Sequence, residues 1–120
     1  QKYGTLVQSI RMISCTGTNV WKPQARRWST SAIGIDQQDK VLFIHVRALY
    51  STHDLINILK KLPLNISRAM YTEGGPQAQL YINSDNKEWE FNGSYETNSN
   101  EANEGSISWP LPNVLGISKR

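Results

Sequence analysis

Apolar positions along this chain recur mostly in short alternating or continuous runs, and only one segment has helical spacing. Such short runs, separated by polar or Gly- and Pro-containing turns, predict β-strands. The run of residues 41–46 is almost continuously apolar, which is typical of a strand covered on both faces. We therefore expect strands at residues 5–14, 28–36, 40–49, 66–73, 79–83, 89–91 and 114–118.

Residues 51–62 are expected to form the main helix. Ser51 can cap its N-terminus with Asp54 three residues later, and Pro63 stops it. Its apolar residues follow helical spacing and form one stripe that is predicted to face the core: Leu55, Ile58, Leu59 and Leu62.

One main helix among several strands predicts an α+β fold, a mostly antiparallel sheet with the helix packed on it. A length of 120 residues fits one domain or part of a larger one. A single helix leaves one sheet face thinly covered and several strand edges open, so we expect a missing N-terminal segment or a second copy to complete the fold. The polar segment 97–105 is expected to be an exposed loop.

Charge and composition exclude several kinds of partner and site for this chain. The net charge of +3 is scattered, and no nucleic-acid-binding motif accompanies it, which argues against nucleic acid as a partner. Cys15 is the only cysteine, so an internal disulfide and a cysteine-based zinc site are excluded. His45 and His53 lack metal-ligand spacing and are interpreted as structural. No apolar run reaches the ~20 residues of a membrane helix.

Candidate chemistry centres on Glu73, Gly74 and Gly75, where a carboxylate ends one apolar run and two glycines precede the next. Glycine permits positive φ and a close approach by a ligand or another backbone. Two interpretations remain open at this point: a site that receives a ligand beside an acid/base carboxylate, or a turn that merely closes a hairpin and carries a solvated glutamate.

Two further segments carry suitable side chains. Arg26 and Arg27 can bind phosphate, and Trp28 can stack on a sugar, although a basic loop edge with Trp28 in the core is an equal alternative. Tyr95 and Glu96 lie in a Gly- and Ser-containing turn, so Glu73 and Glu96 are candidates for a pair of acid/base carboxylates.

Several segments together resemble the phosphodiester glycosidase family, which includes an enzyme acting on N-acetylglucosamine-1-phosphodiesters. Residues 71–77 are similar to its Leu-Asp-Gly-Gly-Gly-Ser segment, residues 31–36 to its Thr-Ala-Ile-Gly strand, residues 7–9 to its Gln-Ser strand and residues 112–117 to its closing strand. The order is the same, and the similarity covers nearly the whole chain, as the C-terminal half of the family's domain.

The chain departs from the family pattern at three positions. Glu73 stands where the family has Asp, Pro76 replaces the third glycine and removes an amide donor, and Thr30 stands where the family has Arg. These departures indicate a divergent branch of the family.

The resemblance implies a hydrolase that cleaves a sugar-1-phosphodiester. Glu73 would be the acid/base or nucleophilic carboxylate, and Arg27, with Arg26, would hold the phosphate. Gly74 and Gly75 would admit the substrate, and Gln8 and Ser9 would line the site. The alternative is a non-catalytic carbohydrate-binding or cell-envelope module of the same fold, which the departures favour. No metal motif is readable, although a site rich in carboxylates and carbonyls is compatible with calcium. The resemblance also implies a secreted or periplasmic location.

Overall fold

The computed structural model describes residues 4–96 and 108–119. The expected loop at 97–105 lies outside these ranges. The elements in chain order are β1 (Ile10–Ile13), β2 (Trp28–Asp36), β3 (Val41–Tyr50), α1 (Thr52–Lys61), β4 (Ile66–Gly74), the 3-10 turn η1 (Gly75–Gln77), β5 (Leu80–Ser84) and β6 (Lys87–Phe91).

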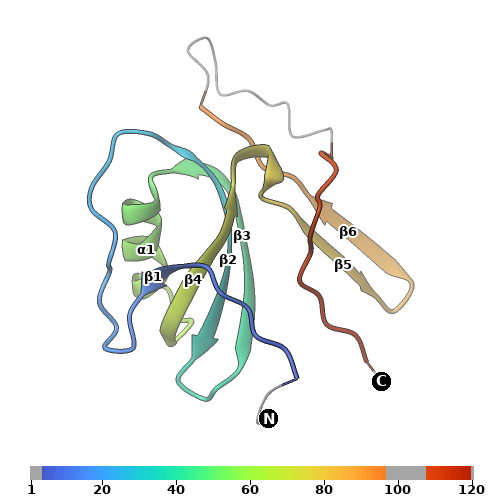
Figure 1. Ribbon diagram of the computed structural model, residues 1–120, viewed down its shortest axis with the longest axis horizontal. Helices are drawn as coiled ribbons and strands as arrows, with labels where there is room; N and C mark the ends of the chain where they lie inside the picture. Colours follow the sequence, from blue (N-terminus) through green and yellow to red (C-terminus); the bar gives the residue numbers. More distant parts are fainter. Residues whose placement is uncertain (1–3, 97–107, 120) are drawn as a thin grey trace.

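Four of the strands form one sheet in the order β1-β4-β2-β3, and every neighbouring pair is antiparallel. β5 and β6 form a separate two-stranded antiparallel sheet. Figure 1 shows α1 on one side of the larger sheet and the β5–β6 hairpin on the other. The expected α+β fold with a mostly antiparallel sheet is therefore confirmed.

The helix begins as its sequence predicts. The Ser51 hydroxyl accepts a hydrogen bond from the Asp54 backbone N–H at 3.1 Å. The helix ends at Lys61, because Leu62 is already extended at ψ 153° and Pro63 follows. Of the predicted core stripe, Leu55 and Leu59 are buried, but Leu62 is 46% exposed and Ile58 is only partly buried. Ile56, which the prediction omitted, is fully buried.

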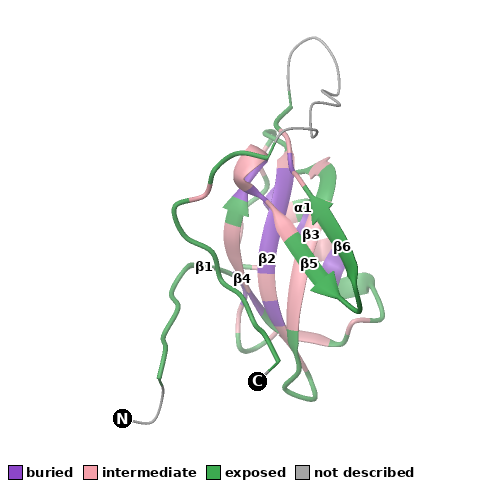
Figure 2. Ribbon diagram, turned by 90° about the vertical axis from the view of Figure 1, so that its right-hand side faces the viewer, coloured by how far each residue is buried: buried purple, intermediate pink, exposed green. Residues whose placement is uncertain are grey.

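The core lies between α1 and one face of the larger sheet. It consists of residues from the helix and from β1, β2 and β4: Met12, Ile13, Ala32, Leu55, Ile56, Leu59 and Ala69. Successive residues of a strand point to opposite faces, so Ile33, Ile35 and Met70 lie on the face away from α1. Figure 2 shows that buried residues concentrate on β2, whereas the hairpin is exposed.

Two of the predicted strands differ from the structure, one in part and the other entirely. Only Ile10–Ile13 of residues 5–14 pair in the sheet, and residues 114–118 form no strand at all. Val114 and Ile117 are 81% and 83% exposed. An apolar segment becomes a strand only where a partner edge satisfies its backbone groups, and this segment has no such ladder within the described residues.

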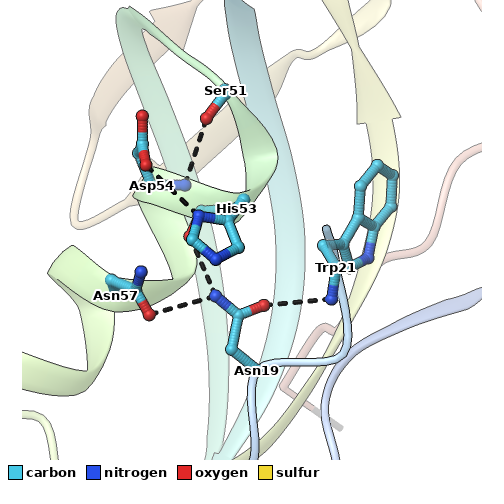
Figure 3. A network of polar contacts seen from close by, with 6 residues as sticks. All are labelled: Asn19, Trp21, Ser51, His53, Asp54 and Asn57. Atoms are coloured by element: carbon cyan, nitrogen blue, oxygen red, sulfur yellow. Dashed lines mark hydrogen bonds and ion pairs between the residues drawn. The ribbon is translucent and has the colours of Figure 1, made fainter. Parts of the chain in front are cut away.

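The loop between β1 and β2 is tied to α1 by Asn19 (Figure 3). Its side-chain amide nitrogen donates to the His53 carbonyl and to Asn57 Oδ1, both at 3.0 Å. Its side-chain oxygen accepts the Trp21 backbone N–H at 3.0 Å. Trp21 in turn donates from its indole to the Arg11 carbonyl at 2.8 Å, so a single side chain links the helix to the loop that borders β1.

We predict that Asn19→Asp lowers the free energy of unfolding by about 1–3 kcal/mol, because it removes two donated hydrogen bonds and sets an anion against two acceptor oxygens. Asn113→Asp, which makes the same change at an exposed position, serves as the control. Denaturant unfolding of both variants tests this. Equal, small effects of the two substitutions would contradict the role assigned to Asn19.

Candidate functional site

Gly74 and Gly75 allow close packing by the chain's own aromatic side chains. A Cβ at Gly74 would overlap the Tyr71 hydroxyl and lie 2.6 Å from Trp28 Cδ1. Gly75 has φ +68°, and a Cβ there would overlap the Tyr95 ring. The two glycines do not close a hairpin, because β4 and β5 belong to different sheets. The space that they open is therefore taken up by Trp28, Tyr71 and Tyr95.

The Tyr71 hydroxyl is held in its neutral form. Burial raises its pKa above the ordinary value, the neighbouring Trp28 indole opposes that rise, and the charges of Glu73 and Tyr95 add to it. The ring also packs against Trp21, with centroids 5.5 Å apart. Tyr71 thus connects the core to the glycine turn and lies within electrostatic reach of Glu73.

Arg27 and Glu96, which lie 69 positions apart in sequence, are brought together by the backbone. Trp28 forms an antiparallel bridge with Tyr95, and the Ser29 N–H donates to the Ser94 carbonyl at 3.0 Å. The Arg27 Nε then donates to Glu96 Oε1 at 3.1 Å, and its Nη2 contacts the same oxygen. Hydrogen bonding to Arg27 lowers the pKa of Glu96. The expected phosphate-binding arginine therefore forms an ion pair with the second expected carboxylate.

Glu73 is exposed, and its Oε1 accepts the Gly74 backbone N–H at 3.0 Å. In the sheet it pairs with Ser31 of β2, and Ser31 pairs with His45 of β3. Residues directly opposite on antiparallel strands share a face, with Cβ atoms about 4.5–5.5 Å apart. Glu73, Ser31 and His45 therefore form a row across three strands on the face away from α1.

Sequence reasoning assigned no function to Ser31 or His45. Ser31 Oγ lies 3.3 Å from His45 Nδ1 and donates to the Gln79 carbonyl at 3.3 Å. The Ser31 hydroxyl has one proton and donates it to the Gln79 carbonyl, so its oxygen can only accept a hydrogen bond from His45. This favours the histidine tautomer with the proton on Nδ1. Burial, followed by the charge of Arg47, lowers the pKa of His45, so the ring is neutral at pH 7. Only strand alternation hinted at a shared face, and it could not give the register.

The expected site residues Arg26, Gln8 and Ser9 do not belong to this row. Arg26 is exposed in the loop before β2. The Ser9 hydroxyl donates to the Tyr71 carbonyl, and Gln8 and Ser9 line a groove beside β1 and β4. Among the described residues, no group of three or more His, Cys, Asp or Glu side chains could hold a metal ion. In the same part of the chain, no helix is long and apolar enough to cross a membrane.

We predict that Gly75→Ala destabilises the fold by about 1–3 kcal/mol, because an L side chain is strained at positive φ and would overlap Tyr95. Thermal or denaturant unfolding measures this loss, with Gly116→Ala as the control, since a Cβ at Gly116 meets no atom within 4 Å. In a Tyr95→Ala background the cost should fall, because only the backbone strain remains. An unchanged cost in that background would show that contact with the ring is unimportant.

We predict that Arg27→Gln raises the pKa of the Glu96 carboxyl toward the ordinary glutamate value, since the hydrogen bond and the positive charge are both lost. An NMR titration of the Glu96 carboxyl carbon measures the shift. Arg26→Gln removes the same charge from the neighbouring residue and should leave Glu96 nearly unaffected. If both variants titrate like the wild type, the ion pair does not persist in solution.

Comparison with known proteins identifies the family of the chain. No curated protein and no solved structure matches the chain. The family described as phosphodiester glycosidase matches residues 1–118, which is nearly the whole chain. The expected resemblance is confirmed, and the chain belongs to the phosphodiester glycosidase family.

Proposed function

We propose that this domain hydrolyses a sugar-1-phosphodiester and that Glu73 is its reacting carboxylate. The observation that carries the proposal is the row of Glu73, Ser31 and His45 on one face of the sheet in a member of this family. An exposed carboxylate and a neutral imidazole, which lie on either side of Ser31 in this row, provide two groups that can move protons during ester cleavage.

In the proposed reaction, Glu73 as a general base removes a proton from water as the water oxygen attacks the anomeric carbon. The bond from that carbon to the phosphate oxygen breaks, and the phosphate monoester leaves with the electron pair. If Glu73 is instead the nucleophile, it forms a glycosyl ester that water then hydrolyses. Either role needs Glu73 in its charged form at the start.

Arg27 is proposed to hold the phosphate, with Arg26 next to it. Glu96 fixes the direction of the Arg27 guanidinium through two contacts on one oxygen. The guanidinium carries five N–H donors in a planar fork, a geometry that suits the oxygens of a phosphate. Glu96 also partly neutralises Arg27, so this arginine serves more to orient the phosphate than to attract it from a distance.

We predict that Glu73→Gln in the complete protein lowers turnover of an aryl sugar-1-phosphodiester by about 10²–10⁴-fold, because it removes the proton-transfer function while keeping the size of the side chain. The matched control is Glu88→Gln, which neutralises an exposed glutamate on β6. Arg27→Lys should cost less, because the charge remains and only the bidentate fork is lost. Wild-type activity that survives Glu73→Gln would remove Glu73 from the mechanism.

A second candidate function is sugar binding without catalysis, and the packing around the glycine turn favours it. Tyr95 is 50% exposed, and its ring rests on Gly75 next to Trp28, where it presents an aromatic face on which a sugar could stack. Titration with the sugar alone separates the two functions. Sugar binding that Tyr95→Ala weakens, together with no wild-type hydrolysis, would establish the binding module and exclude the enzyme.

A further inference from the structure

A groove of about 310 Å³ lies beside β1, β2 and β4 and takes no part in the proposed reaction. Its floor is apolar and comes from neighbouring strands. Ile33 pairs with Met70, and Ile35 pairs with Arg68, so these four side chains share the face away from α1. The volume is at the lower end of the range for ligand pockets, which is about 300–1,000 Å³.

Two arginines flank this floor. Arg11 of β1 pairs with Met70 of β4, so its side chain lies on the same face as that of Arg68, which is two positions from Met70 along β4. Both arginines are exposed and line the groove. Among the described residues, neither forms an ion pair, and no acidic residue lines the groove.

The two arginines therefore differ from Arg27, which Glu96 partly neutralises. Two uncompensated guanidinium groups beside an apolar floor attract an anion and favour one that carries an apolar group. Gln8 and Ser9 add polar groups at the border of the groove. An anion without an apolar group would leave Ile33, Ile35 and Met70 uncovered, and a neutral apolar molecule would leave both charges unused.

We propose that this groove binds a small alkyl or aryl phosphate, with the phosphate between Arg11 and Arg68 and the apolar group on Ile33, Ile35 and Met70. The site does not depend on the hydrolase activity proposed above, because it is defined by binding and uses none of the residues around Glu73. A loss of activity in Glu73→Gln therefore does not test binding in the groove. A loss of binding in the groove, in turn, does not test the proposed hydrolase activity.

Cys15 provides a local reporter for the test. It is exposed, it lines the groove, and it is the only cysteine in the chain. A ligand bound in the groove should slow alkylation of its thiol. The probes are hexyl phosphate, inorganic phosphate and hexanol, which separate the contribution of the charge from that of the apolar group. Calorimetry gives the affinity, and the rate of alkylation reports the location.

Hexyl phosphate should bind in the groove and protect Cys15 from alkylation. Its affinity should be at least 10-fold higher than that of inorganic phosphate or hexanol. The double variant Arg11→Gln/Arg68→Gln should lose at least 10-fold in affinity. Lys60→Gln/Lys61→Gln removes two charges from the end of α1 and should bind like the wild type. Ile35→Thr should weaken hexyl phosphate more than inorganic phosphate, because it removes only apolar contact.

Three results would overturn the proposal. The first is hexyl phosphate binding that leaves Cys15 unprotected, and the second is equal affinity in the arginine and lysine double variants. The third is binding to vesicles of an anionic phospholipid without binding of soluble hexyl phosphate, which would indicate a membrane surface in place of a small-molecule site.

Discussion

The structure depends on the position of β2, which is hydrogen-bonded on both edges, to β3 on one side and to β4 on the other. Small side chains on β2 allow close packing in the layer between α1 and the sheet. Ala32 is buried in the core, and Gly34 leaves room for Ile66 of β4, since a Cβ at Gly34 would lie 2.9 Å from Ile66 Cδ1.

The other face of β2 carries the row of side chains to which we assign the proposed chemistry. Ser31 lies between Glu73 and His45, and the register of β4 shifts between Ser31 and Ala32. Such a β-bulge redirects the side chains beyond it. In this sheet, the shift brings Glu73 opposite Ser31 at the end of the strand, just before the glycine turn. The proposed reacting carboxylate is thus positioned by backbone pairing with the best-buried strand.

Three of the arginines stand in two different electrostatic environments. Arg27 is fixed by Glu96 at the junction of β2 with residues 93–96, where an ion pair between exposed groups orients a side chain more than it stabilises the fold. Arg11 and Arg68 lie on the sheet face away from α1 and have no described ion-pair partner. In the two proposals, Arg11 and Arg68 would therefore attract a phosphate more strongly, whereas Arg27 would orient one more selectively.

The sequence alone determined the central elements and the family. Alternation and continuous apolar runs identified β2 and β3, the Ser51 cap and Pro63 placed α1, and the order of the family-like segments identified the phosphodiester glycosidases. These features are local, or they depend on the order of segments, so they can be read along the chain.

Only the tertiary structure decided which distant side chains meet. The Arg27–Glu96 ion pair and the Glu73–Ser31–His45 row follow from strand order and register, which no local pattern specifies. The same limit explains the wrong strand at residues 114–118, since an apolar run cannot reveal whether a neighbouring edge is open to it. It also explains the glycine turn, where Trp28 and Tyr95 occupy the space that Gly74 and Gly75 leave, because a missing Cβ shows that something comes close and does not show what.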